Sequence, residues 1–267
     1  MTTPAALLRI APGQRVLFAS DLHLNPADPA TATLALNAID RHSPGAAHLF
    51  LLGDLFEMWV GDDGADELAE RFATLLRGLA ARGTHIWLMR GNRDFLLDVP
   101  LPGAGPDSPL SPGPFSRHCA ATLLSDPCVI DLHGQPALLT HGDALCTDDT
   151  VYQTWRTTCR HPGWQQAMLA RPLAERQAIG RQARDSSEAG KREMSGALMD
   201  VNQQAVDAAM DAAGVSLLIH GHTHRPAVHR WQHGGVERMR VVLTDWDARG
   251  PRGSLLGWHQ GKLEPLT

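Results

Sequence analysis

The sequence predicts an α/β protein with a layered core, and two observations lead to that prediction. Apolar runs of four to six residues recur along the chain, and each ends in a glycine or a polar cluster, as buried strands do. Helical patterns lie between the first three runs, and strands that alternate with helices indicate a layered α/β core. The 267 residues suit one large domain, or one domain with an insertion.

Five apolar runs are the expected buried strands, and they span residues 15–20, 48–52, 85–89, 137–140 and 215–220. Two helices are expected between the first three runs, at 29–41 and 66–82. Pro29 suits a first helical turn. Apolar residues recur at helical spacing through the second segment, and Gly83 suits its C-terminal cap.

The remaining segments differ in character. After Thr223, short runs separated by glycine turns predict antiparallel strands that complete a sheet, at residues 227–232, 237–244, 253–260 and 262–266. Residues 98–114 are rich in proline and glycine and predict a surface loop. Residues 151–199 predict two or three helices. We therefore expect a core of residues 1–150 and 200–267 that carries residues 151–199 as an inserted helical segment.

Composition narrows the class of protein. The net charge is −5, so no whole-chain charge favours nucleic acid, and no feature implies a protein partner. Four cysteines without a C-x-x-C pair fit a reducing cytosol. The first 20 residues do not resemble a secretory leader, and no run is long enough to span a bilayer. We expect a cytoplasmic protein whose membrane contact, if it has one, is peripheral.

The inserted segment has a charge of its own. Residues 151–199 hold eight basic and four acidic residues, a balance of 8 − 4 = +4 on an otherwise acidic chain. A solvated helical face is the ordinary explanation of such a charge run. Trp155 and Trp164 lie among the basic residues, however, and apolar and basic groups together suit a lid over an anionic, greasy ligand.

Five polar clusters follow the expected strands: D-L-H at 21–23, G-D at 53–54, G-N-R-D at 91–94, H-G-D at 141–143 and G-H-T-H at 221–224. Strand ends of an open α/β sheet are where ligands bind. The clusters supply a mixed oxygen and nitrogen ligand set that suits Mn²⁺, Fe²⁺, Zn²⁺ or Co²⁺ better than Mg²⁺ or Ca²⁺. The seven candidate metal ligands are Asp21, His23, Asp54, Asn92, His141, His222 and His224.

Seven ligands are too many for one ion and suit two ions bridged by a carboxylate. Asp54 is the expected bridge. The first ion would take Asp21, His23, Asp54 and His224, and the second would take Asp54, Asn92, His141 and His222. A water that bridges both ions would lose its proton near neutral pH and attack a phosphorus atom in line.

These five blocks resemble the calcineurin-like binuclear metallophosphoesterase superfamily, whose pattern is D-x-H, G-D, G-N-H-[DE], H and G-H-x-H. One position departs from it, since Arg93 stands where most members carry a histidine. The resemblance implies a four-layer α/β/β/α sandwich, here with the helical segment inserted as a lid.

Longer stretches are similar to the UDP-2,3-diacylglucosamine pyrophosphatase family of lipid A biosynthesis. They include LGDLFEMWVGDD at 52–63, GNRDFLL at 91–97 and HGDALCTDD at 141–149. The resemblance implies hydrolysis of a lipid-linked UDP-sugar to UMP and 2,3-diacylglucosamine 1-phosphate by attack on the α-phosphorus. It also implies two Mn²⁺ ions, a lid over the acyl chains, and peripheral attachment to the cytoplasmic face of the inner membrane.

The same resemblance implies roles for single residues. Asp54, Asn92 and Arg93 would be catalytic, and the substrate would contact Asn92, Arg93, Asp149, Tyr152, Ser187, Lys191 and His222. One residue and one segment depart from the family. Met194 replaces a frequent lysine, and residues 243–247 read L-T-D-W-D where Gly-x-Trp-His is usual.

Two alternatives stay open at this point. The chain could be a metallophosphoesterase for another nucleotide or phosphodiester, or a metal-free scaffold of the same fold. An open basic groove would favour the first, and a protein that binds no divalent metal would favour the second.

Overall fold

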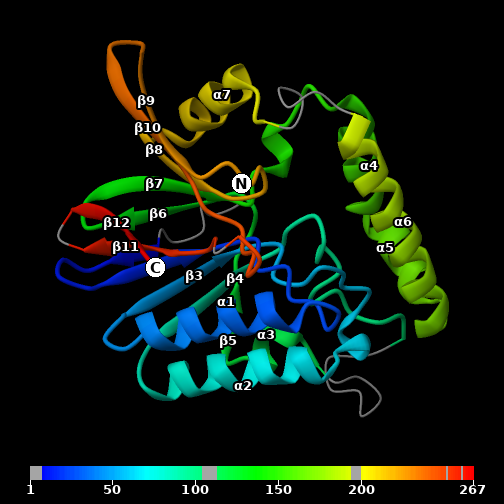
Figure 1. Cartoon of the computed structure of the whole chain (residues 1–267). Helices are drawn as coiled ribbons and strands as arrows, with labels where there is room; N and C mark the ends of the chain where they lie inside the picture. The colour runs from blue at the N-terminus through cyan, green and yellow to red at the C-terminus, as the bar shows by residue number, and fades with distance from the viewer. Residues whose placement is uncertain (1–7, 104–112, 194–199, 251, 260) are drawn as a thin grey trace.

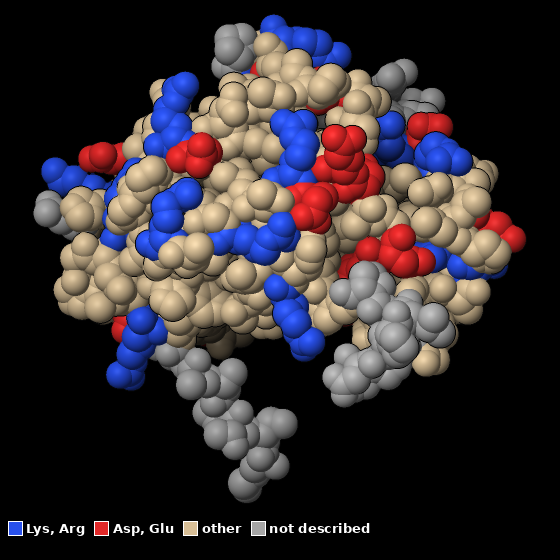
Figure 2. All heavy atoms as spheres, turned by 90° about the horizontal axis from the view of Figure 1, so that it is seen from below, with Lys and Arg blue, Asp and Glu red and all other residues tan. Residues whose placement is uncertain are grey.

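The computed structural model describes residues 8–103, 113–250, 252–259 and 261–267, except 194–199, and gives only the backbone for 186–193. Two six-stranded sheets face each other and carry helices on their outer sides (Figure 1). The predicted four-layer α/β/β/α sandwich is thereby confirmed. Basic and acidic side chains lie interspersed on the face of the molecule that Figure 2 presents.

The first sheet is mostly parallel. Strands β2 to β5 run parallel, β11 pairs antiparallel with β2, and β12 pairs antiparallel with β11. In spatial order the strands are β12 (Lys262–Leu266), β11 (Leu255–His259), β2 (Val16–Ala19), β3 (His48–Leu52), β4 (His85–Met89) and β5 (Ala121–Leu123). Every residue of β2 and β3 is buried, which explains why both are continuous apolar runs.

The second sheet is mixed. It holds β1 (Leu8–Ile10), β6 (Cys128–Leu132), β7 (Gln135–Thr140), β8 (Leu217–His220), β10 (Val236–Val242) and β9 (Ala227–His233), in that spatial order. Apolar side chains of both sheets fill the space between them. Phe18 and Phe50 stack there with ring centroids 5.2 Å apart, beside Leu139 and Ile219 of the second sheet.

Helices cover both outer faces. On the first sheet, α1 (Pro29–His42) begins where Asp28 accepts a hydrogen bond from the Thr31 amide, and α2 (Glu67–Ala81) is capped likewise by Asp66. The short α3 (Phe115–His118) lies on the same side (Figure 1). On the second sheet, α7 (Gln203–Ala213) packs Val206 and Met210 against strands β7 and β8.

Three further helices, α4 (Thr150–Cys159), α5 (Pro162–Leu169) and α6 (Leu173–Glu193), stand together at one end of the sandwich (Figure 1). They occupy the segment for which two or three helices are predicted. Within the described residues, no helix is both long and apolar enough to cross a bilayer.

The sequence prediction was wrong about the C-terminal strands. They do not complete one sheet, because β9 and β10 join the second sheet and β11 and β12 join the first. Local alternation indicates a strand but does not specify its pairing partner, which packing between distant segments decides. The prediction also lacked β1, β5, β6 and α7, and residues 104–112 of the predicted loop lie outside the described part.

Candidate metal centre

The seven candidate ligands meet at one end of the two sheets. Asp21 and His23 follow β2, Asp54 follows β3, and Asn92 follows β4. From the other sheet, His141 follows β7, and His222 and His224 follow β8. The carboxyl ends of parallel strands share an edge, so residues far apart in sequence converge here.

The ligands form two groups, in each of which the candidate atoms lie within 4.8 Å of one another. Asp21, His23 and His224 make the first group, and Asp54, His141 and His222 make the second. The predicted sets are larger, since they count Asp54 with both ions and add Asn92 to the second, and the assignment of ligands to ions stays a prediction.

Asp54 faces both groups. Its Oδ2 lies 3.9 Å from His23 Nε2 and its Oδ1 lies 3.5 Å from His141 Nε2. The amide oxygen of Asn92 joins the second group, 3.0 Å from His141 Nε2 and 2.7 Å from His222 Nδ1. The arrangement therefore offers a shared carboxylate between two clusters of oxygen and nitrogen donors.

The backbone is strained where these side chains leave it. Asp21, His23, Asp54, His222 and His224 have φ angles of 52°, 45°, 51°, 68° and 53°. L-residues adopt this left-handed conformation rarely, and such residues gather at functional sites. These conformations direct the side chains of neighbouring loops toward the same metal centre.

Two glycines allow the loops to approach each other. A Cβ on Gly91 would lie 2.1 Å from Asp54 Oδ1, and a Cβ on Gly221 would lie 2.2 Å from Asp21 Oδ2. Asp21 also accepts a hydrogen bond from the His222 amide at 3.0 Å, which ties the first sheet to the second. Any larger residue at these glycines would push the ligands apart.

The second nitrogen of three imidazoles has an oxygen partner. His141 Nδ1 lies 2.9 Å from the Leu52 carbonyl, His23 Nδ1 lies 3.0 Å from Glu57 Oε2, and His224 Nδ1 lies 3.3 Å from Asp245 Oδ2. The His141 contact is a hydrogen bond, and the other two are ion-pair contacts in which the carboxylate charge can orient the ring. All three leave Nε2 free for a metal ion. Glu57 and Asp245 are not predicted by the motif pattern, although they lie in the stretches 52–63 and 243–247 quoted above.

Charges within the centre shift pKa values strongly. Burial alone would raise the pKa of Asp21, but His224, His141 and His23 outweigh it and hold the pKa far below its usual range. Burial would lower the pKa of His141, but the carboxylates of Asp54 and Asp21 raise it to about 9. Burial and His141 lower the pKa of His222 to about 3, so its imidazole is neutral and can donate a lone pair.

These donors fit a pair of divalent transition-metal ions. The carboxylates Asp21 and Asp54 are almost fully buried, so their negative charges need positive charges nearby. Without a metal cation, protonated histidines beside them would have to supply those charges. Mixed carboxylate, amide and imidazole sets bind Mn²⁺, Fe²⁺, Zn²⁺ or Co²⁺. The structure thus contains two candidate sites for divalent metal ions.

Arg93 stands at the edge of this centre. Its backbone N–H donates to Asp54 Oδ1 at 2.8 Å, and its guanidinium Nη1 lies 3.9 Å from Glu57 Oε1. Phe95 follows two residues later, and its ring lies 5.9 Å from that of Trp164 on α5. Trp164 in turn contacts Trp155 of α4 at 5.3 Å. Aromatic side chains therefore lead from beside Arg93 out to the exposed helix α4.

The other residues with predicted substrate contacts lie on the helical side. The Tyr152 ring stacks on His222 with centroids 6.0 Å apart, and its hydroxyl donates to buried Asp143 at 2.5 Å. Asp149 caps α4 by accepting from the Tyr152 amide at 2.9 Å. The side chains of Ser187, Lys191 and Met194 lie outside the described residues.

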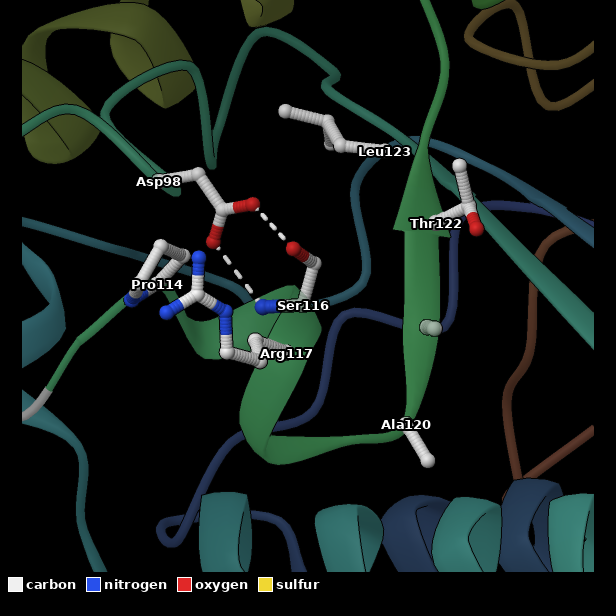
Figure 3. Close-up of a pocket in the computed structure, with 8 residues that line it drawn as sticks. Asp98, Pro114, Ser116, Arg117, Ala120, Thr122 and Leu123 are labelled. Atoms are coloured by element: carbon white, nitrogen blue, oxygen red, sulfur yellow. Dashed lines mark hydrogen bonds between the residues drawn. The ribbon is translucent and has the colours of Figure 1, made fainter.

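A separate open pocket of about 500 Å³ lies beside α3 and β5 (Figure 3). Its lining contains Asp98, Ser116 and Arg117 and none of the candidate ligands. Asp98 accepts hydrogen bonds from the Ser116 amide and hydroxyl, which holds the start of α3. Asp98 and Ser116 therefore have a structural role at this pocket.

Comparisons with known proteins found a family, relatives and solved structures that are similar to this chain. Residues 14–226 match the family described as calcineurin-like phosphoesterase. A UDP-2,3-diacylglucosamine hydrolase of Stenotrophomonas maltophilia (strain K279a) is 43% identical over 256 residues, covering 92% of this chain and 98% of that protein. One of Hahella chejuensis (strain KCTC 2396) is 44% identical, covering 86% and 88%. A solved archaeal phosphodiesterase aligns with a TM-score of 0.43 at 11% identity, covering 95% and 99% of the two chains.

Proposed function

This chain belongs to the calcineurin-like phosphoesterase family, and we propose that it hydrolyses the pyrophosphate of UDP-2,3-diacylglucosamine. The products are UMP and 2,3-diacylglucosamine 1-phosphate, and the reaction belongs to lipid A biosynthesis. The observation that carries the proposal is that Asp54 faces a histidine of each ligand group, with Arg93 beside it. Relatives that bear this activity in their names, at 43% and 44% identity over most of both chains, support the choice of substrate.

Two divalent cations complete the site in this proposal, and Mn²⁺ is the ion we expect. Asp21, His23, Asp54 and His224 would hold one ion, and Asp54, Asn92, His141 and His222 would hold the other. Such a pair supplies charge that activates a water and stabilises the phosphoryl oxygens during in-line displacement.

The protein positions the pyrophosphate. The planar fork of Arg93 suits two phosphoryl oxygens at once, which a single ammonium group does less well. The water oxygen forms a bond to the α-phosphorus, and the bond from that phosphorus to the bridging oxygen breaks. The electron pair leaves with the sugar phosphate, and the protons of the water go to solvent. Arg93 thus stabilises charge that grows on the oxygens of the pyrophosphate.

The helical segment supplies the apolar side of the proposed site. The aromatic path from Phe95 through Trp164 to Trp155 can line the entry of acyl chains next to Arg93. Val151 and Trp155 are one turn apart on α4 and are 81% and 39% exposed. Exposed apolar groups on a net basic segment favour peripheral binding to an anionic membrane surface, which we propose is the cytoplasmic face of the inner membrane.

The test is hydrolysis by metal-stripped protein with and without added Mn²⁺, in water enriched in ¹⁸O. We expect Mn²⁺-dependent release of UMP that carries the label, and unlabelled 2,3-diacylglucosamine 1-phosphate. Label in the sugar phosphate would overturn attack on the α-phosphorus. Cleavage of a simple phosphodiester without cleavage of the lipid substrate would favour another substrate. No activity and no bound metal would favour the metal-free scaffold.

A further inference from the structure

Helix α6 rests on the segment that directly follows Asp54. Arg176, Gly180 and Arg184 are spaced four residues apart, so they lie along one face of the helix. All three contact residues 57–63. This face of α6 therefore docks on the loop that leaves the metal centre.

Arg176 is the fixed end of this docking face. Its side chain is almost fully buried, and Nη1 donates to the Val60 carbonyl at 2.6 Å and to Asp63 Oδ1 at 2.8 Å. Next along the face, a Cβ on Gly180 would lie 2.6 Å from Met58 Sδ. The glycine thus permits close approach of the helix.

Arg184 is the end nearer the metal centre. Its Nε donates to Glu57 Oε1 at 2.7 Å. The other oxygen of the same carboxylate lies 3.0 Å from Nδ1 of the metal-ligand candidate His23. Glu57 Oε1 also lies 3.9 Å from Arg93 Nη1. One carboxylate therefore contacts the helical segment, a candidate ligand and the arginine assigned to the pyrophosphate.

We propose that Glu57 is a positioning residue that couples docking of helix α6, through Arg184, to the geometry of the metal centre. The inference rests on the proposed function, because it gives His23 a metal ion to hold and Arg93 a phosphate to bind.

The coupling follows from the two oxygens of Glu57. While Arg184 holds Oε1, the charge on Oε2, 3.0 Å from His23 Nδ1, orients the ring with its Nε2 toward the centre. When α6 undocks, Glu57 loses that cation, and Arg93 is the nearby guanidinium toward which the carboxylate can turn. Undocking therefore loosens His23 and draws Arg93 away from the substrate, whereas docking over bound substrate completes the site.

The experiment compares four variants of the full chain after removal of metal. Glu57→Gln removes the charge at constant shape, Arg184→Ala removes the helix contact, and Arg184→Lys restores a cation. Arg181→Ala is the matched control, because Arg181 is an exposed arginine on the same helix. Two readouts apply to each: Mn²⁺ affinity by calorimetric titration, and amide hydrogen exchange of α6 in the metal-free protein.

We expect Glu57→Gln to weaken binding of one Mn²⁺ by about 10- to 100-fold, as loss of an outer partner of a ligating histidine does. Arg184→Ala should weaken the same ion by a smaller factor and speed exchange in α6, and Arg184→Lys should restore part of both. Arg184→Ala that matches Arg181→Ala in both readouts would overturn the coupling. Wild-type protein that binds no Mn²⁺ would overturn the proposed function itself, which separates the two failures.

Discussion

Asp245 Oδ2 lies 3.3 Å from Nδ1 of His224, a candidate ligand of the first metal group. Arg252 holds the same oxygen from the other side with a 2.6 Å hydrogen bond from Nη2. Asp245 is almost fully buried and belongs to the segment 243–247 that departs from the family pattern. Aligned on Trp246, Asp245 occupies the unspecified position of Gly-x-Trp-His, so it is not itself a departure. It places a buried carboxylate behind a candidate ligand, where its charge can orient the ring.

Replacing Asp245 by Asn should weaken metal binding rather than abolish the fold. The shape is kept, but the amide lacks the charge that steadies the His224 ring, and we expect Mn²⁺ affinity to fall by about 10- to 100-fold. Calorimetric titration of the metal-free protein measures it. Asp247→Asn is the control, since Asp247 lies on the same loop and pairs with exposed Arg249. Equal affinities of the two variants would contradict the role.

Asp54→Ala should remove turnover and reduce the metal content. Its two oxygens face different histidines, so the loss affects both groups at once, whereas loss of Asn92 would affect one. We expect the variant to retain less than one tightly bound ion per chain by elemental analysis. Asp40→Ala, which removes an exposed partner of Arg82, should keep the wild-type content. A full complement of metal in Asp54→Ala would rule out a bridging role.

Arg93→Ala should lower kcat/KM roughly 10- to 150-fold. This corresponds to a loss of about 1.5–3 kcal/mol of transition-state stabilisation, the usual contribution of a charge-assisted contact. Arg93→Lys should recover only part, because an ammonium group lacks the forked geometry. Steady-state release of UMP measures both. Arg117→Ala, a change to an exposed arginine of α3, is the control. Near-normal turnover of Arg93→Ala would remove Arg93 from the mechanism.

The candidate ligands could be predicted from sequence because each follows a strand that contains a run of buried apolar residues. The runs before Asp21 and Asp54 are fully buried strands, and the ends of such strands meet at one edge of a sheet. Glu57 and Asp245 could not be predicted in this way. Their partners His23 and His224 are brought to them by backbone turns with positive φ, which the residue types do not reveal.

The fold shows the same limit. Helices α1 and α2 have local signals, since Asp28 and Asp66 cap them and their apolar residues are periodic. Strand β1, of three residues, pairs with β6 more than 100 residues away in the chain, between Leu8 and Ile130 among others. So short a run carries no clear periodicity, and only long-range packing makes it a strand.

Membrane binding should depend on the exposed face of α4. Val151→Ser and Trp155→Ser together remove two apolar side chains from that face. Their burial in the membrane surface would contribute about 1–2 kcal/mol, so we expect vesicle affinity to fall by about 5- to 30-fold. Co-sedimentation with vesicles containing anionic lipid measures it. Val228→Ser, at a valine that is 56% exposed on β9, is the matched control. An equal loss in the control would exclude α4 as the contact face.

Stability should depend on pH through Asp62, which lies away from the metal centre. The carboxylate accepts hydrogen bonds from the Trp59 indole at 2.9 Å and from the amides of Phe115 at 3.0 Å and Asp98 at 3.1 Å. Burial nevertheless raises its pKa from 3.8 to about 6. The protonated Asp62 carboxyl is therefore favoured more in the folded state than in the unfolded chain. The stability that this proton confers is complete below pH 3.8 and is lost as pH rises through about 6.

Asp62→Asn removes that dependence. We therefore compare the free energies of unfolding and take the wild-type value minus the variant value. This difference should decrease between about pH 4 and 6 and become constant above about pH 7. Urea unfolding of metal-free protein at a series of pH values measures the difference and avoids the linkage between metal binding and protons. Asp40→Asn, at an exposed carboxylate, should show no such trend. A difference that increases with pH would mean that the hydrogen bonds to Asp62 outweigh its burial, and that its pKa is lowered.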